Sequence, residues 1–178
     1  MYFMNTTGVI RKIDDLGRIV IPKEIRKTLK IRNGESLEIF IDKDMVALKR
    51  YHPMDELKIM ASTLVESIYQ TSNKSIFITD RDKFIACPDC LKKTYLNKPI
   101  SNLLESLIEE GSPLANKDVE KIELINGNII KGSYAAYPIM EEQGLVGLVI
   151  ITSDIKLTDG DTNIAQITAI FLGKHIEE

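Results

Sequence analysis

The sequence has little of what marks several common classes of protein. Its 178 residues include no tryptophan and two cysteines, and no run of eighteen apolar residues occurs in it. Two cysteines are too few for a disulfide framework, and without a long apolar run we expect no membrane-spanning helix. The opening residues, Met1 to Asn5, lack the basic start and the apolar core of a secretory signal peptide. We therefore expect a cytoplasmic protein with no membrane partner.

Motifs that carry enzyme chemistry are also missing. The sequence contains no Gly-x-x-x-x-Gly-Lys phosphate loop, no His-Glu-x-x-His zinc helix and no Gly-x-Ser-x-Gly nucleophile elbow. Its two histidines, His52 and His175, fall at the ends of expected elements, where we expect surface side chains. We therefore expect neither an enzyme nor a resident metal or cofactor.

Charge is distributed unevenly along the chain, although the net charge is only −3. Residues 1–52 carry eleven Lys and Arg against seven Asp and Glu, a net charge of +4, and the remaining residues carry −7. The excess is concentrated in residues 11–32, with eight basic and three acidic side chains. A basic segment on an acidic body favours a polyanionic partner such as nucleic acid, although a solvated basic face gives the same pattern.

Residues 8–51 are expected to form short strands around one short helix. The expected elements, in chain order, are a strand at 8–14, a strand at 18–21, a helix at 23–30 and a hairpin of strands at 37–41 and 45–51. Pro22 suits the first helical position because its φ is fixed, and Asn33-Gly34 suits the end of the helix. A unit of about fifty residues is close to the lower limit for a self-sufficient core. We therefore expect two chains to interleave within residues 1–52 and complete one core.

A boundary is expected at His52-Pro53, because a residue before proline is pushed out of the helical region. A linker helix, from Met54 to Gln70, is expected within residues 53–74. Its apolar residues recur with heptad-like spacing at Leu57, Ala61, Leu64 and Ile68. This stripe either packs on the following domain or pairs with the same helix of another subunit, and the periodicity leaves both open.

Residues 75–178 are expected to form a second domain of mixed strands and helices, which makes the whole chain α+β. The expected strands lie at 75–79, 83–86, 121–125, 133–140 and 145–152, and the expected helices at 100–110 and 159–175. The strand at 145–152 is a nearly continuous apolar run, which is typical of a central strand covered on both faces. Thr158 and Asp161 have the spacing of a capping box at the start of the last helix.

The most informative stretch of the sequence runs from Gly8 to Lys30. It reads G-V-I-R-K-I-D-D-L-G-R-I-V-I-P-K-E-I-R-K-T-L-K. It resembles the swapped-hairpin domain of the AbrB-like transition-state regulators, and the resemblance covers residues 6–51 almost without a gap. The resemblance implies a DNA-binding β-barrel interlocked from two chains. The whole chain resembles members of this group in which such a domain precedes a GAF-type α/β domain. This resemblance also implies a homotetramer, held by the C-terminal domains and the helix at 54–70, that represses and activates sporulation-type genes.

The resemblance also identifies the residues expected to contact double-stranded DNA. The positions that match the family's arginines are Arg11, Arg18, Arg26 and Lys27, with Lys12 and Lys23 as auxiliaries. The family commonly carries arginine where Lys27 stands, and lysine lacks the planar, two-pronged guanidinium that suits a guanine edge. We therefore expect Lys27 to contact a phosphate. The residues themselves place these cations on a strand, a turn and a helix, which a compact unit could bring to one face.

The GAF-type domain raises the question of a small-molecule ligand. Ile76, Phe77 and Ile78, together with Tyr134 and Tyr137, could line a pocket, but branched and aromatic residues on strands more often belong to a core. A regulatory ligand would have to bind the DNA-competent and DNA-incompetent states differently, with the helix at 54–70 as the coupling element.

The segment Cys87-Pro88-Asp89-Cys90 is the one feature that suggests chemistry. Two residues between the thiols suit a thiol-disulfide switch or half of a tetrathiolate zinc site. A zinc site would need His52, His175 or another subunit for its remaining ligands, and no thioredoxin-like context surrounds the pair. An ordinary loop explains the segment as well.

Two other functions compete with DNA-binding regulation. Residues 1–52 could be an antitoxin-like module that blocks a partner protein and also touches DNA, but the domain that follows is far larger than the disordered tail of such antitoxins. The pair Cys87 and Cys90 could instead serve a thiol redox protein.

Overall fold

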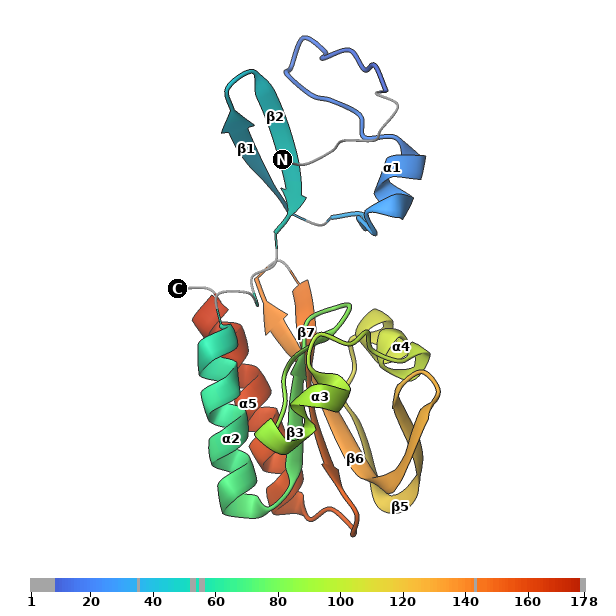
Figure 1. Ribbon diagram of the computed structural model, residues 1–178, viewed down its shortest axis with the longest axis vertical. Helices are drawn as coiled ribbons and strands as arrows, with labels where there is room; N and C mark the ends of the chain where they lie inside the picture. Colours follow the sequence, from blue (N-terminus) through green and yellow to red (C-terminus); the bar gives the residue numbers. More distant parts are fainter. Residues whose placement is uncertain (1–8, 35, 52–53, 55–56, 143, 177–178) are drawn as a thin grey trace. The chain divides into compact units, whose positions relative to one another are not determined.

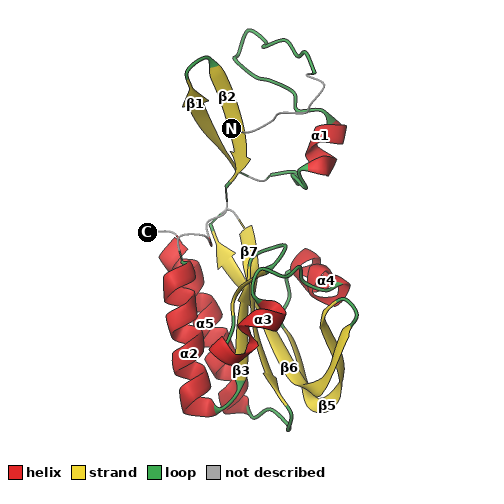
Figure 2. Cartoon of the chain, in the orientation of Figure 1, coloured by secondary structure: helices red, strands yellow, loops and turns green. Residues whose placement is uncertain are grey.

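The computed structural model describes residues 9–34, 36–51, 54, 57–142 and 144–176 (Figure 1). The chain divides into two compact units, Met1–Tyr51 and His52–Glu178. The first unit carries a short helix and a two-stranded hairpin, and the second carries a five-stranded sheet with helices on both faces (Figure 2). This mixture confirms the α+β class. Within the described ranges, no helix combines the length and apolarity needed to cross a bilayer.

The helix of the N-terminal unit is shorter than the sequence predicts. Helix α1 spans Lys23–Thr28, and Pro22 is its N-cap residue rather than its first helical residue. The helix ends early because Lys30 takes a left-handed φ of 53° and Ile31 donates its N–H to the carbonyl of Arg26. This reversal closes the last turn, as left-handed residues commonly do after a helix.

The hairpin is confirmed, but the two strands expected before the helix are not formed. Strands β1 (Leu37–Asp42) and β2 (Met45–Arg50) pair antiparallel. Residues 9–14 and 18–21 have no strand assignment, so their prediction as strands is wrong for the single chain. A strand needs a neighbouring strand to accept and donate its backbone hydrogen bonds. Among the described residues of this unit, the hairpin is the only sheet.

No residue that the structure describes in the N-terminal unit is buried. Its exposed large apolar side chains are Val9, Ile10, Ile13, Leu16, Ile19, Val20, Leu29, Ile39, Phe40, Ile41, Met45, Val46 and Leu48. Several of them border an open apolar groove of about 450 Å³ between the extended segments, α1 and β2. The unit therefore has the side chains of a core, and its own described residues do not close one.

The C-terminal unit is built on an antiparallel sheet with the strand order β4-β3-β7-β6-β5. The strands are β3 (Ser75–Thr79), β4 (Phe84–Ala86), β5 (Leu114–Ile125), β6 (Asn128–Glu141) and β7 (Gly144–Ser153). All five expected strands are present, and β5 and β6 extend further because they pair along a long hairpin. Strand β7 lies in the middle, which confirms the prediction of a central strand.

Helices cover both faces of this sheet (Figure 1). The helices are α2 (Lys58–Ser72), α3 (Lys92–Tyr95), α4 (Asn102–Glu110) and α5 (Asp159–Ile176). Helices α2 and α5 enclose one apolar core, and α3 and α4 enclose the other. The capping box at α5 is confirmed, because Thr158 N–H donates to the Asp161 carboxylate and Asp161 N–H donates to the Thr158 hydroxyl.

The apolar stripe of the expected linker helix packs inside its own domain. Leu57 and Ala61 are buried in the core under α2, and Leu64 and Ile68 pack against the same core. Of the two interpretations that the periodicity allowed, the structure therefore supports packing on the following domain for these four residues. Ile59 of α2 is 84% exposed and takes no part in this packing.

Candidate nucleic-acid interface

A tight turn presents Arg18. Asp14 N–H donates to the Arg18 carbonyl at 3.1 Å, and Gly17 N–H donates to the Asp14 carbonyl at 2.9 Å. Gly17 has a φ of 76°, a left-handed conformation that glycine adopts without strain. The Asp14 carboxylate completes the turn, because its Oδ1 accepts the backbone N–H groups of Leu16 at 3.0 Å and Arg18 at 2.8 Å.

The same carboxylate holds the Arg18 side chain. Asp14 Oδ2 accepts Nε–H of Arg18 at 2.7 Å, while the Arg18 side chain remains 71% exposed. The backbone N–H of Arg18, and after it the guanidinium, hold the pKa of the Asp14 carboxyl below its ordinary value of 3.8. An ion pair this exposed contributes little to stability. The ion pair instead restricts the orientation of the side chain, because it holds the Nε edge of the guanidinium.

The side chain of Arg26 is directed by a second turn. Arg26 lies on α1, and its Nη1 donates to Oδ1 of Asn33 at 2.9 Å. Asn33 precedes Gly34, which has a φ of 82°. Arg26 is half-buried by these surroundings, whereas Lys27 beside it on the helix is exposed. The two cations at the end of α1 therefore differ in burial as well as in shape.

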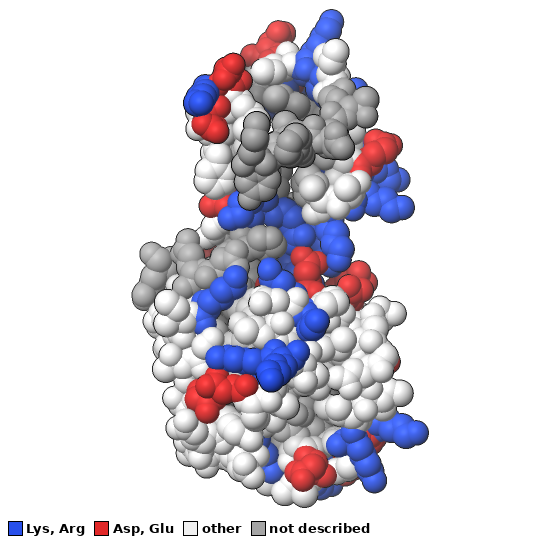
Figure 3. Space-filling view, in the orientation of Figure 1, with Lys and Arg blue, Asp and Glu red and all other residues white. Residues whose placement is uncertain are grey.

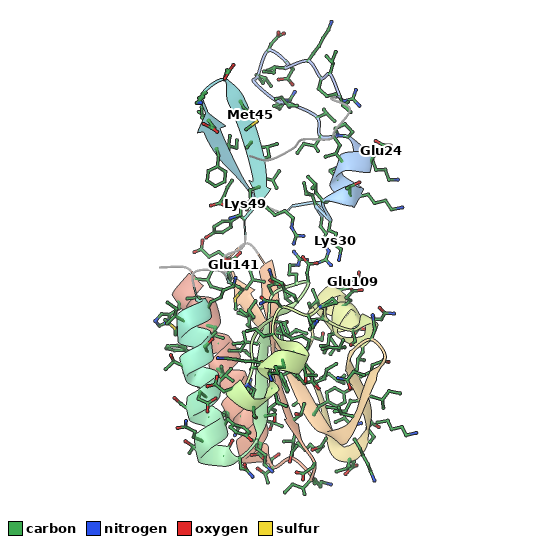
Figure 4. The ribbon with its side chains drawn as sticks, in the orientation of Figure 1. Glu24, Lys30, Met45, Lys49, Glu109 and Glu141 are labelled. Carbon is green, nitrogen blue, oxygen red and sulfur yellow. The ribbon has the colours of Figure 1, made fainter. Side chains whose placement is uncertain are left out.

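The other expected DNA contacts are exposed on two segments. Arg11 and Lys12 lie on the extended segment before the turn, and Lys23 is the first residue of α1. Arg11 borders the apolar groove together with residues of α1 and β2. Lys and Arg side chains lie on the surface of this unit in Figure 3. Glu24 on α1 and Lys30 just after it are likewise exposed (Figure 4). Contact between the six cations and DNA stays a prediction.

Sequence reasoning missed Asp14 and Asn33 as the partners of Arg18 and Arg26. The usable signals were an aspartate three residues before Gly17, and an asparagine directly before Gly34. Both are typical of turns in which a short polar side chain binds nearby backbone. Neither spacing shows that the same side chain also reaches an arginine.

The two cysteines lie in different environments. Cys87 is 2% exposed, and burial raises the pKa of its thiol to about 11, whereas Cys90 is exposed beside the Tyr69 hydroxyl of α2. A buried thiol with a raised pKa is a weak nucleophile. Across the described residues, no three His, Cys, Asp or Glu side chains gather as metal ligands. His175 packs against the ring of Phe171, and His52 lies outside the described residues.

The positions suggested for a ligand pocket belong mainly to the two cores. Ile76 and Ile78 face the core under α2 and α5, and Phe77 faces the other core. The Phe77 ring lies 4.7 Å from that of Tyr95, so this space is filled by aromatic side chains. Tyr134 is 5% exposed, and burial raises its pKa. The structure therefore agrees with the interpretation of these positions as core residues.

The chain has clear relatives among known proteins. Residues 56–177 match the family described as stage V sporulation protein T C-terminal, transcription factor. Stage V sporulation protein T of Bacillus subtilis (strain 168) is 40% identical over 178 residues, covering 98% of this chain and 100% of that protein. The chain belongs to the stage V sporulation protein T family.

The N-terminal unit of this stage V sporulation protein T family member has further relatives. Residues 10–54 match the family described as antidote-toxin recognition MazE, bacterial antitoxin. Transition state regulatory protein AbrB of Bacillus subtilis (strain 168) is 51% identical over 51 residues, which cover 29% of this chain and 53% of that protein. This identity confirms that the N-terminal domain is AbrB-like.

The C-terminal unit of the family member has the fold of a GAF domain. The A. aeolicus nlh2 GAF domain, solved in an inactive state, aligns with 67% of this chain and 84% of its own, with a TM-score of 0.53. The sequence identity is 12%, so the likeness concerns the fold alone. The expected arrangement of an AbrB-like domain before a GAF-like domain is confirmed.

Proposed function

We propose that this chain is a cytoplasmic, DNA-binding regulator that represses and activates transcription of sporulation-type genes as a homo-oligomer. The observation that carries the proposal is the AbrB-like unit with its exposed cations, in a chain whose second domain belongs to a transcription-factor family. The names of its relatives, a transition state regulatory protein and a stage V sporulation protein, support the gene class.

The proposed contacts with double-stranded DNA are the residues that match the family's arginines. They are Arg11, Arg18, Arg26 and Lys27, with Lys12 and Lys23 as auxiliaries. Lysine and arginine that neutralise phosphates release counterions, so affinity falls steeply with salt. Four cations from each of two protomers would neutralise about eight phosphates and give a log-log salt slope as steep as roughly −7.

The proposed dimer forms through residues 1–52. Its support is the absence of any buried residue among the described part of this unit, together with the apolar groove between Val20, Ile25 and Leu48. A second copy placed in the groove would bury these side chains. It would also supply hydrogen-bond partners to segments 9–14 and 18–21, which then become the strands that their sequence favours.

The proposed tetramer uses the C-terminal domain and the helix at 54–70. Helices α2 and α5 cover the same face of the sheet (Figure 1), and both carry exposed apolar side chains. These side chains are Ile59, Ile167, Ile170 and Phe171. If these side chains form one surface, that surface is typical of packing against another subunit.

The test is a salt series of DNA binding, measured by fluorescence anisotropy with a duplex from a sporulation promoter. Arg18→Ala removes one cation per protomer, so it should weaken binding and flatten the slope by about two units per dimer. Lys43→Asn is the matched control, because Lys43 is an exposed cation at the β1–β2 turn whose φ of 54° suits asparagine. Equal flattening by both variants would mean that only net charge matters. A wild-type protein that ignores duplexes in dilute buffer, or that is monomeric by ultracentrifugation, would overturn the proposal.

The match of residues 10–54 to an antitoxin family supports a second candidate, in which the same unit binds a partner protein. The 51% identity with a transition state regulatory protein over a similar stretch favours DNA instead. Purification of the chain in a stoichiometric complex with a second protein would favour the antitoxin-like function, and purification as a homo-oligomer alone would oppose it.

A further inference from the structure

Asp14 makes more hydrogen bonds than a turn needs. Its Oδ1 accepts two backbone N–H groups of the turn, and its Oδ2 accepts Nε–H of Arg18 at 2.7 Å. The two backbone bonds fix the place of the Arg18 backbone. The third bond fixes the long side chain, which otherwise samples many rotamers and loses that freedom when it binds a partner.

We propose that Asp14 is a positioning residue that holds the Arg18 guanidinium in its DNA-binding conformation before DNA is bound. This inference rests on the proposed function. With Nε engaged, the two terminal nitrogens of Arg18 keep their four N–H donors, and the side chain remains 71% exposed. A pair of terminal nitrogens fits two phosphate oxygens or the O6 and N7 atoms of guanine. The carboxylate therefore occupies the inner edge of the guanidinium and leaves the outer edge for DNA.

The proposal makes a prediction that simple electrostatics contradicts. A carboxylate near a duplex repels the phosphates, so removing its charge should tighten binding to any DNA. If Asp14 positions Arg18, removing its charge should weaken binding, because Arg18 must then be ordered when DNA binds. The two effects have opposite signs, so one substitution separates them.

The chain offers a matched control in the next residue. Asp15 is an exposed carboxylate in the same turn, and among the described residues it accepts no hydrogen bond from Arg18. Asp14→Asn and Asp15→Asn remove the same charge from neighbouring positions. Asparagine at 14 keeps an Oδ1 acceptor for the Leu16 and Arg18 backbone N–H groups, so the turn itself is retained.

The experiment measures the dissociation constant of the full chain for one promoter duplex at fixed salt. Asp14→Asn should weaken binding about tenfold through two freed arginines per dimer. Asp15→Asn should leave binding unchanged or tighten it. In an Arg18→Ala background, adding Asp14→Asn should cause no further weakening, because the side chain to be positioned is gone.

Three results of the binding experiment would overturn the inference. Binding by Asp14→Asn as tight as by Asp15→Asn would leave no role for the carboxylate beyond its charge. Weakening that persists in the Arg18→Ala background would show that Asp14 merely maintains the turn. A wild-type chain without DNA affinity would remove the proposed function and this inference together, which distinguishes that failure from the other two.

A spectroscopic signature accompanies the binding data. In the free wild-type protein, the Arg18 Nε–H resonance should be shifted and protected from exchange by its bond to Asp14. The resonance should lose its protection in Asp14→Asn and keep it in Asp15→Asn. Retained protection in Asp14→Asn would mean that Arg18 is held by another group, and the inference would fall.

Discussion

The two units of this chain use their apolar residues in opposite ways. In the C-terminal unit, Leu148 and Ile150 face one core and Val149 and Ile151 face the other, and all four are fully buried. In the N-terminal unit no described residue is buried, and Ile10 is 91% exposed. Full burial of such a side chain contributes about 1.5–3 kcal/mol. The second unit thus buries its apolar residues within one chain, and we propose that the first buries them against a partner chain.

The largest effect is expected at an isoleucine that is exposed in the single chain. Ile19 is 54% exposed and borders the groove that we assign to a second copy. Ile19→Ser should remove buried contacts in the dimer at a cost of about 2–5 kcal/mol per protomer. We expect dissociation by analytical ultracentrifugation and loss of DNA binding at the same protein concentration.

The comparison between units supplies the control for that variant. Ile129 on β6 is 64% exposed, in a unit that already has two cores. Ile129→Ser should change the free energy of unfolding by less than about 0.5 kcal/mol. If Ile19→Ser is equally silent, the N-terminal unit does not bury its apolar residues against another chain.

The next largest effect is expected within the C-terminal cores. Leu148→Ala empties a fully buried site on β7 and should lower the free energy of unfolding by about 2–5 kcal/mol. Urea denaturation followed by far-UV circular dichroism measures it. Met140→Ala, at a position 50% exposed on β6, is the control and should cost far less. Equal midpoints for the two variants would contradict the assignment of Leu148 to a core.

A smaller effect is expected from oxidation of the two thiols. Its measurement tests whether a change in the C-terminal unit alters DNA binding by the N-terminal unit. Because the pKa of Cys87 is raised to about 11, only about 0.1% of it is thiolate at pH 8, whereas Cys90 is exposed. A thiol reagent should therefore modify Cys90 rapidly and Cys87 only on unfolding, as mass spectrometry of the labelled peptides would show. We expect equal DNA affinity with and without reductant in wild type and in Cys87→Ser. A loss on oxidation that Cys87→Ser abolishes would establish a redox switch.

The smallest effect compares one carboxylate from each unit. The pKa of Asp14 is lowered first by the Arg18 backbone N–H and then by the guanidinium, and the pKa of Asp159 is lowered by Lys117. Both pairs therefore favour the folded protein above pH 3.8, and that contribution is lost as the pH falls through the lowered pKa. In a carboxyl-carbon NMR titration, Lys117→Ala should return Asp159 close to its ordinary pKa. Arg18→Ala should raise Asp14 only partly, because the backbone donors remain, and a complete return would show that the turn had opened.

The C-terminal fold could be predicted well because its signals are local. The apolar run that became β7 and the capping pair Thr158 and Asp161 each specify an element from a few neighbouring residues. The predicted ranges of β5 and β6 were shorter than the observed strands. Polar residues such as Asn116 and Lys131 gave no strand signal, but each is accommodated because the partner strand pairs with it.

In the N-terminal unit, the predictions failed for segments whose structure depends on groups outside the local sequence. Residues 9–14 and 18–21 have the alternation of strands, but no strand lies beside them in the described chain. The sequence predicted a turn before Arg18, yet it did not show which of Asp14 and Asp15 accepts the backbone N–H groups of the turn. That choice follows from the left-handed backbone at Gly17, which brings the N–H groups of Leu16 and Arg18 toward Asp14.

Strand β7 makes this chain sensitive to a particular kind of genetic change. Successive side chains from Leu148 to Ile151 alternate between the two cores, and Gly147 has no room for a side chain because it lies against the carbonyl of Thr79. One inserted codon before Gly147 would turn each following side chain of the strand toward the opposite core, as happens when a strand slips by one residue. Two inserted codons would restore the alternation. Tolerance to insertions before this strand should therefore depend on whether an odd or an even number of residues is added.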